Sequence, residues 1–527
     1  MKNKSAGIIT IILIIAFSCK RKHDASWDAD YSVPLGKASL TVNDLLADSL
    51  LSLNPDNSLN LVIDYNLLRF SIDSLIEIPD TILTDAYTLP FPFPLTANPG
   101  QNFISNSSVT RYNLSGAELK EAELKTGVIN YSIKNPLPEK VVCTFSISGA
   151  INTNGQPFLR TITASAAVNG ISSNTSGSFS ISGYNIDLRG PYGDDYNTIV
   201  SNTSFKIVDD GNPTLVTNQD TLYFTYSFES IRPQYVYGYF GNFNQQIGPS
   251  ETNFSLFNNF ISGLLDIDQV SVRLDIINGI GADARINIQS LYAKNSQNSS
   301  QVNLTHNLIG NSQNINRAFR SGNNISPSTH QYLLDNTNSN IDLLIENLPD
   351  KLGYEAFFQL NPFGNVSGNN DFAHADYPFE INLLAELPLR FIANDLTLQR
   401  DFVLNITDIE RFNSARLKIK AVNTFPFKAD LWVYLLDNTG NVADSVLAAG
   451  IINAGVLDFN NIVQSPGTSE PIAVFNKPQL ELLQNNKKIR IKAVFNTVNQ
   501  TQHQNIYNYY KLDLDIRADF NYTMLLN

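Results

Sequence analysis

The sequence predicts an all-β protein, built of several β-sandwich units in an elongated arrangement with a few short helices. Apolar and polar residues alternate in runs of strand length along much of the chain. Asn, Gly, Ser and Pro, which favour turns, bound these runs. Strands that follow one another with turns between them favour sandwiches over a βαβ sheet. The clearest predicted strands are residues 59–63, 128–133, 141–147, 221–228, 417–422, 431–436, 489–494 and 512–516.

Helical patterns are few and short. Residues 41–53 have Thr41 or Asn43 as a possible N-cap before a set of leucines, and residues 254–265 form a second pattern. Residues 478–485 form a third, with Pro478 at a favoured first-turn position.

The N-terminus predicts export. Lys2 and Lys4 precede an apolar run over residues 8–16, which is too short to span a bilayer and is typical of a secretory signal. The following Ala16-Phe17-Ser18-Cys19 resembles the lipobox of bacterial lipoproteins. This resemblance implies that residues 1–18 are a signal peptide, that Cys19 is acylated, and that residues 19–36 form the acylated cysteine and its tether.

Charge and cysteine content narrow the classes of partner. The formal charge is −13, and loss of residues 1–18 removes Lys2 and Lys4 and no acid, which leaves −15. No long basic stripe offsets this charge, so we expect no nucleic-acid partner. The basic cluster Lys20-Arg21-Lys22 either lies against anionic headgroups or is a solvated part of the tether. With Cys19 acylated, Cys143 has no partner for a disulfide, and its apolar strand pattern predicts a buried thiol.

One internal repeat consists of a strand, a turn that begins with Asn, and a second strand. Two copies contain Asn135-Pro136-Leu137-Pro138 and Asn423-Thr424-Phe425-Pro426, and a weaker copy contains Asn278-Gly279-Ile280-Gly281. Asn tolerates turn geometry and Pro ends strand pairing. The motif resembles the strand–Asn-Pro–strand corner of immunoglobulin-like domains of the WHy/late-embryogenesis-abundant type. We predict β regions over residues 37–248, 249–414 and 415–527.

Further features resemble large outer-membrane lipoproteins of Bacteroidetes. These are the lipobox, the Asn-rich sandwich sequence and the segment over residues 27–35. Five Asp-Ser/Thr-aliphatic triplets are similar to the O-glycosylation sequon of that phylum, and they begin at Asp48, Asp73, Asp80, Asp220 and Asp444. Surface-displayed lipoproteins of that phylum carry acidic residues directly after the acylated Cys. Here Lys20-Arg21-Lys22 takes that place, which favours the periplasmic face of the outer membrane, with the cell surface as the alternative.

The sequence contains no motif for catalysis and indicates no cofactor. It lacks His-Glu-x-x-His, Gly-x-Ser-x-Gly and a glycine-rich phosphate loop, and no two of its five histidines have metal-ligand spacing. We therefore expect a protein that is not an enzyme. Asp371, His374 and Asp376 are the one combination that offers metal-ligand chemistry, and a plain polar loop is the competing interpretation.

Tyr235, Tyr237 and Tyr239 fall on one face of a predicted strand. Tyrosine combines a large ring with a polar tip, so the three side chains suit core packing, a protein contact or stacking on a glycan. The predicted function is that of a non-catalytic, outer-membrane-anchored scaffold or accessory subunit of an envelope assembly, with an outer-membrane protein as partner. The alternatives are a carrier of a lipid or another hydrophobic ligand, and a glycan-binding surface lipoprotein.

Overall fold

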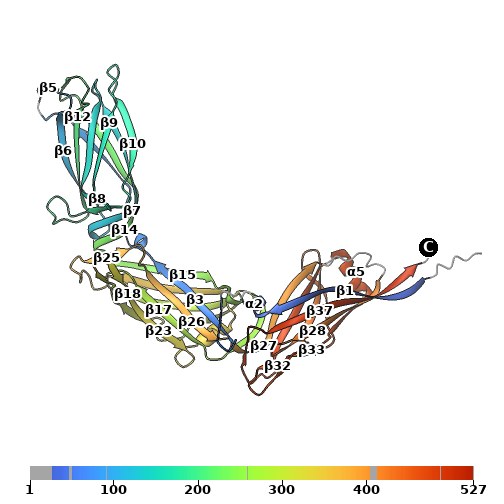
Figure 1. Cartoon of the computed structure of the whole chain (residues 1–527). Helices are drawn as coiled ribbons and strands as arrows, with labels where there is room; N and C mark the ends of the chain where they lie inside the picture. Colours follow the sequence, from blue (N-terminus) through green and yellow to red (C-terminus); the bar gives the residue numbers. More distant parts are fainter. Residues whose placement is uncertain are drawn as a thin grey trace, which may run out of the picture.

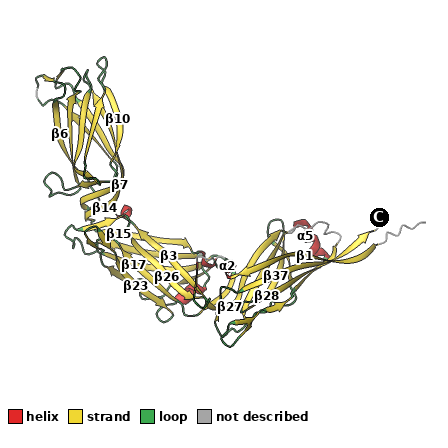
Figure 2. Ribbon diagram, in the orientation of Figure 1, coloured by secondary structure: helices red, strands yellow, loops and turns green. Residues whose placement is uncertain are grey.

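The computed structural model of the protein describes residues 26–46, 50–76, 78–90, 92–257, 259–403, 412–486 and 488–525. It confirms the all-β class: the described chain consists of antiparallel strands with a few short helices (Figure 2). These strands form three sandwich units that follow one another along a bent arm (Figure 1). We name them the terminal unit, which carries both ends of the described chain, the middle unit and the outer unit. None of the helices in the described residues has the length and the apolar character of a membrane-spanning helix.

The terminal unit contains two facing sheets and α5 (Lys477–Asn486). The first sheet consists, in spatial order, of β1 (Ser26–Thr41), β37 (Lys511–Leu525), β28 (Phe412–Asn423) and, both beside β28, β33 (Gly467–Ser469) and β34 (Ile472–Phe475). The second consists of β16 (Ser262–Ile267), β27 (Arg390–Val403), β35 (Lys488–Thr497), β29 (Phe427–Leu436) and β30 (Val442–Leu447), with β36 (Gln504–Asn505) beside β27.

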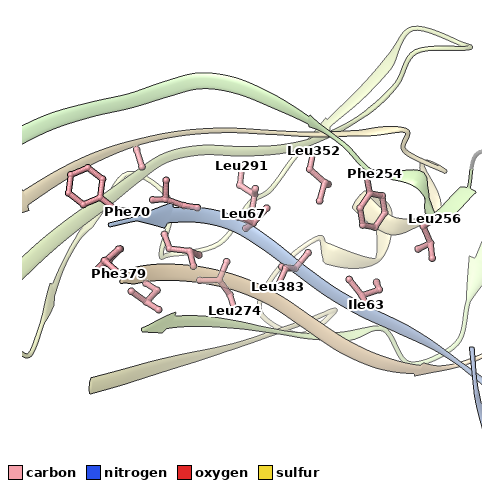
Figure 3. Packing of buried hydrophobic residues seen from close by; sticks show 14 of the residues in the cluster. Ile63, Leu67, Phe70, Phe254, Leu256, Leu274, Leu291, Leu352, Phe379 and Leu383 are labelled. Carbon is pink, nitrogen blue, oxygen red and sulfur yellow. The ribbon is translucent and has the colours of Figure 1, made fainter. Parts of the chain in front are cut away.

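The middle unit repeats this plan. Its first sheet consists of β2 (Leu51–Leu53), β3 (Leu59–Phe70), β26 (Phe379–Pro388), β17 (Ser271–Asn278) and β23 (Ser328–Asp335). Its second consists of β15 (Phe243–Asn253), β24 (Lys351–Leu360) and β18 (Ala284–Asn295), with β19 (Ser300–Asn303) and β20 (Ser312–Ile315) both beside β18. Leu67 and Leu383 of the first sheet face Leu291 and Leu352 of the second, so the core lies between the sheets (Figure 3).

The outer unit has the same two layers, joined along one side. One layer consists of β4 (Thr81–Tyr87), β14 (Leu222–Tyr239), β7 (Glu118–Asn135) and β10 (Ser173–Ser180). The other consists of β6 (Asn102–Arg111), β12 (Thr198–Ile207), β8 (Val141–Asn152) and β9 (Pro157–Ala164). Strand β11 (Tyr184–Asp187) pairs with both β7 and β8 and so joins the layers. At the far tip, β5 (Leu95–Ala97) pairs with β13 (Thr214–Val216) (Figure 1).

The three units are nested within one another along the chain. Each first sheet contains a strand that comes early in the sequence, namely β1, β3 and β4, and each of these pairs with the last strand of its own unit, β37, β26 and β14. The chain thus starts the terminal unit, starts the middle unit, builds the outer unit completely, and then returns to finish the other two. The predicted regions 37–248, 249–414 and 415–527 are contiguous. The outer unit lies within the first of them, whereas the middle and terminal units draw strands from both sides of the 248/249 boundary. Residues 26–36 of the predicted tether lie in β1.

The repeated asparagine makes the same three hydrogen bonds in each unit. Asn135, Asn278 and Asn423 end β7, β17 and β28, and each is 1% exposed or less. In every copy the side-chain oxygen accepts the backbone N–H two residues later. The side-chain nitrogen donates to the carbonyl four residues later and to a second carbonyl from another part of the same unit. The sequence repeat therefore marks one structural corner that occurs once per unit.

The helices agree with the prediction in part. The pattern at 478–485 is confirmed as α5. The predicted helix at 41–53 was too long, because α2 (Val42–Leu45) is followed by β2, which pairs with β3. Thr41 is its N-cap, and the carboxylate of Asp44 accepts hydrogen bonds from the backbone N–H and the hydroxyl of Thr41. The pattern at 254–265 is wrong as a helix, since it forms only a single turn, η2 (Ser255–Phe257), and then enters β16.

Candidate binding surfaces

Two of the predicted site groups meet at the joint between the outer and middle units. Strand β14 pairs with β7 along its length, and its residues 235–238 also pair with β25 (Asp371–His374), which belongs to a loop of the middle unit. In this pairing Tyr235 lies opposite His374 and Tyr237 lies opposite Phe372. The tyrosine stripe and the Asp/His loop are therefore parts of one inter-unit contact, although more than a hundred residues separate them in sequence.

Tyr235 is a packing residue of this joint. It is 7% exposed and packs with Phe372 and Ala318. The guanidinium of Arg320 lies 4.7 Å from the centre of its ring and hydrogen-bonds to its hydroxyl. Its ring is thus covered by the middle unit, whereas Tyr237 and Tyr239 are half-buried.

Asp371 stabilises the same joint through hydrogen bonds to its buried carboxylate. Its side chain is fully buried, and its carboxylate accepts hydrogen bonds from Arg317 Nη2 at 3.2 Å, Asn361 Nδ2 at 2.7 Å and the backbone N–H of Phe240 at 3.2 Å. A buried carboxylate needs such partners to offset its lost hydration. Near it, Gly238 has a positive φ of 151°, and a Cβ there would lie 2.2 Å from the backbone oxygen of Glu118. Only glycine fits where β14 crosses β7 so closely.

His374 and Asp376 point away from Asp371. Their side chains form an ion pair at 3.7 Å, and Gln234 Nε2 lies 3.4 Å from His374 Nε2 and 3.3 Å from the Asp376 carboxylate. Asp371 is instead occupied by Arg317 and Asn361. Within the described ranges, no three His, Cys, Asp or Glu side chains gather in a way that could hold a metal ion. These three side chains therefore take part in the contact between the outer and middle units.

A polar cleft of about 330 Å³ lies beside the joint, on the outer unit. It contains donors, acceptors and one aromatic ring, and its lining residues are Lys120, Glu121, Gly149, Ile151, Asn185, Asp187, Arg189 and Tyr237. Arg189 makes two side-chain hydrogen bonds to Asp187, at 2.9 and 2.7 Å, and these bonds lower the pKa of the Asp187 carboxyl. Asn185 Nδ2 donates to Glu121, while its Oδ1 has no partner. The cleft thus holds side chains of both charge signs, and the Oδ1 of Asn185 is buried beside it.

The loops at the far end of the outer unit expose large apolar side chains. Val168 and Ile171 flank a tight turn in which Asn169 and Gly170 both have positive φ, as a two-residue hairpin turn requires. Leu215 is exposed on β13, and Phe93 is exposed in the loop before β5. We call Phe93, Val168, Ile171 and Leu215 the tip residues; all are 59–74% exposed. Exposed apolar side chains gathered at one end of a molecule are typical of a protein contact.

The terminal unit contains an apolar cavity of about 280 Å³ between its two sheets. Apolar residues of β1, β37, β28, β27, β35 and α5 line it, among them Leu35, Phe412, Leu480, Ile489 and Phe520. The next three apolar cavities have volumes of about 30, 50 and 60 Å³, which are sizes left by ordinary packing. The terminal cavity approaches the lower limit of roughly 300 Å³ for small-molecule pockets.

Cys143 is fully buried in β8, which confirms the prediction of a buried thiol. Burial raises the pKa of its thiol to about 12, so the reactive thiolate does not form near neutral pH. Cys19 and the predicted signal peptide lie outside the described residues. The described structure therefore contains one cysteine, which is part of the core of the outer unit.

No protein-family model matches the chain, and no curated protein matches it. Among solved structures, the chain is similar to a protein from Parabacteroides distasonis described as secreted, with 13% identity over 53% of this chain and 82% of that chain and a TM-score of 0.26. A broad bean stain virus structure matches with 9% identity over 56% of this chain and 92% of that chain, with a TM-score of 0.13. Scores this low carry no argument about fold or function.

Proposed function

We propose that the protein is a lipid-anchored, non-catalytic scaffold of the outer membrane of a Bacteroidetes-like bacterium, facing the periplasm. In this proposal Cys19 carries the lipid, and the chain acts as an arm that holds the outer unit away from the membrane for an envelope protein partner. The observation that carries the proposal is the linear order of the units. Both ends of the described chain are at one end of the arm, and the tip residues are at the other (Figure 1).

The position of Cys19 in the sequence determines which end of the arm would lie at the membrane. Ser26 pairs with Leu525 at the free end of the terminal unit. Cys19 is seven residues before Ser26, and seven extended residues span at most about 25 Å. An acylated Cys19 would therefore keep the terminal unit near the bilayer. The outer unit, two units further along, would lie farthest from it.

The tip residues are the proposed contact with the protein partner. Interfaces derive most of their binding free energy from a few large side chains that become buried. Phe93 and Ile171 have the size and the exposure for this role. Tyr235 does not, because Arg320 and Phe372 already cover its ring.

The test is recovery of the tagged lipoprotein from its native membrane in mild detergent, with mass spectrometry of the proteins that accompany it. The variant Phe93→Ser/Val168→Ser/Ile171→Ser/Leu215→Ser should lose a partner that the wild type recovers in stoichiometric amount. The matched control is Leu333→Ser/Leu343→Ser/Phe363→Ser/Val366→Ser, which changes four equally exposed apolar residues of the middle unit. Equal recovery by both variants would contradict the proposed contact.

The polar cleft favours a second candidate function, the binding of a glycan. Tyr237 offers an aromatic ring, and Glu121, Asn185 and Arg189 offer acceptors and donors within one cleft. Sugars are bound by this combination of ring contact and polar side chains. A glycan array with the mature protein tests it: Tyr237→Ala should abolish any signal that Tyr223→Ala, a change of an exposed tyrosine outside the cleft, leaves intact.

A further inference from the structure

We propose that the terminal unit docks onto the lipid bilayer through an apolar face of β1 and β37, and that its cavity accepts a phospholipid acyl chain. This inference rests on the proposed membrane anchor and adds to it a second, non-covalent membrane contact. It is carried by two features of the described residues, the amphipathic pattern of the strand pair and the cavity that continues the pattern, and by the short separation in sequence between Cys19 and β1.

The strand pair β1–β37 is amphipathic. Its apolar face carries Trp27, Tyr31, Val33 and Leu35, which are 43–49% exposed. Directly opposite on β37, Phe520 pairs with Tyr31 and Ala518 pairs with Val33. Residues that are directly opposite in an antiparallel pair share a face, so the exposed side chains of β1 continue the face that carries the buried Ala518 and Phe520. We call this surface, made of Trp27, Tyr31, Val33, Leu35, Ala518 and Phe520, the apolar face.

The other side of the same strand pair is polar. Asp28 accepts a hydrogen bond from Thr523 at 2.8 Å, and Asp30 accepts one from Asn521 at 3.0 Å. Further along, the hydroxyl of Ser39 donates to Asp513 at 2.7 Å. These charged and polar side chains suit contact with water, and burying them among acyl chains would cost free energy. The strand pair therefore has a single orientation in which it can lie on lipid.

The cavity continues the apolar face toward the body of the unit. Leu35, Ala518 and Phe520 belong to the face and also line the cavity. Behind them Phe412 stacks on Phe520 with ring centres 4.5 Å apart, and α5 contributes Leu480. An apolar cavity of about 280 Å³ exceeds the roughly 150 Å³ that suffices for a benzene ring, so it can take part of an acyl chain.

The residues and the position favour a bilayer as the occupant. Trp and Tyr are enriched where proteins meet the membrane–water interface, and Trp27 and Tyr31 are the first two aromatic residues of the described chain. Cys19 lies eight residues before Trp27, with the cations of Lys20-Arg21-Lys22 directly after it. Each such cation adds about 1 kcal/mol near an anionic surface. The apolar face is thus the part of the protein that an acylated Cys19 would bring closest to lipid.

The test uses the mature chain with Cys19→Ser, so that no acyl group contributes, and phosphatidylcholine vesicles with and without phosphatidylglycerol. The chain has two tryptophans, Trp27 and Trp432, so Trp432→Phe leaves Trp27 as the only reporter. Vesicles should shift the Trp27 emission to shorter wavelength, and lipids with brominated acyl chains should quench it. An emission that vesicles neither shift nor quench would overturn the proposal.

The matched variants locate the contact. Trp27→Ser/Tyr31→Ser/Val33→Ser/Leu35→Ser should weaken vesicle binding about tenfold or more, because it removes four large apolar side chains from the contact. The control Val109→Ser/Leu159→Ser/Val168→Ser/Ile171→Ser changes four apolar residues of the outer unit that are more exposed, at 54–74%, and it should bind as wild type. Equal loss in both variants would contradict the assignment to this face.

Two further results would assign the face differently and overturn the proposal. Binding that requires phosphatidylglycerol and disappears at high salt would belong to Lys20-Arg21-Lys22, since salt screens charges and leaves apolar contacts. A blue-shifted Trp27 emission before lipid is added, together with a doubled mass in solution, would show that a second copy of the chain covers the face. Acylation of Cys19 is measured separately, by mass spectrometry of the native protein, so the anchor and the docking face can fail independently.

Discussion

The outer and terminal units share a two-layer plan with the same asparagine corner, but they close their cores differently. In the outer unit Phe145 lies among Phe158, Phe224 and Tyr226, with ring centres 5.0–6.0 Å away, and all four side chains are 1% exposed or less. In the terminal unit the space between the sheets, near the start of β28, holds the apolar cavity. The shared corner asparagine shows that the fold does not require the cavity. The two units therefore differ in how the space between their sheets is filled. The outer unit has a filled core, whereas the terminal unit has a cavity and is the unit proposed to contact lipid.

Truncating one aromatic residue in each core should give the largest difference. Phe145→Ala should destabilise the outer unit by about 4 kcal/mol, because the buried ring leaves an enclosed cavity. Phe520→Ala should cost the terminal unit only about 2 kcal/mol, because it enlarges a space that is already open. Urea unfolding, followed by tryptophan emission for the terminal unit and by Cys143 reactivity for the outer unit, measures both. Equal losses would show that the two cores are packed alike.

Removing the corner asparagine should affect both units equally. Asn135→Ala and Asn423→Ala each leave two carbonyls and one N–H without their partner. We expect a loss of about 3 kcal/mol in the free energy of unfolding of the unit that carries the change. The same urea experiment tests this, with Asn174→Ala, an exposed asparagine of β10, as the control. A loss in only one unit would mean that the corners are not energetically equivalent.

Adding volume should have opposite effects in the two units. Ala164→Leu inserts three carbons into the filled core of the outer unit and should destabilise it by about 1–3 kcal/mol. Ala415→Leu extends into the terminal cavity and should stabilise the lipid-free protein by about 1 kcal/mol. Thermal unfolding measures both changes. A destabilising Ala415→Leu would show that the cavity is filled in solution.

Alkaline pH should weaken the outer unit alone through its thiol. The folded state holds the pKa of Cys143 at about 12, while an unfolded cysteine titrates near 8.5. Below about 8.5 both states are protonated and this stability is fully present; as pH rises toward 12 only the unfolded state ionises, and the stability is lost. At pH 9.5 the loss is about 1.4 kcal/mol relative to Cys143→Ala, measured by urea unfolding. A Cys143→Ala protein with the same pH dependence would contradict this.

The local structure was predictable and the nesting was not. Alternation identified β8 and β29, and the repeat identified Asn135, Asn278 and Asn423, because these signals lie within a few residues. The pairing of Ser26 with Leu525 crosses nearly the whole chain, and no local pattern encodes it. Pairing that depends on such distant segments is a property of the folded chain alone.

The candidate sites also depend on contacts between segments that are distant in the sequence. Tyr235, Tyr237 and Tyr239 were placed on one strand, yet β25 and Arg320, which cover Tyr235, come from much later in the sequence. The tip residues carry no periodic signal, because Val168 and Ile171 stand alone beside a turn. The apolar alternation over residues 27–33 was present in the sequence, but only the structure shows which residues of β37 share its face and that Trp27 and Val33 are exposed.

In the proposed arrangement one end of the arm contacts lipid and the other contacts a protein. Site-specific photo-cross-linking in native membranes distinguishes the two ends, with benzoylphenylalanine placed at Tyr31 on the apolar face or at Ile171 on the tip. We expect lipid adducts from position 31 and adducts with a single protein from position 171. Protein adducts from position 31, or lipid adducts from position 171, would contradict this arrangement.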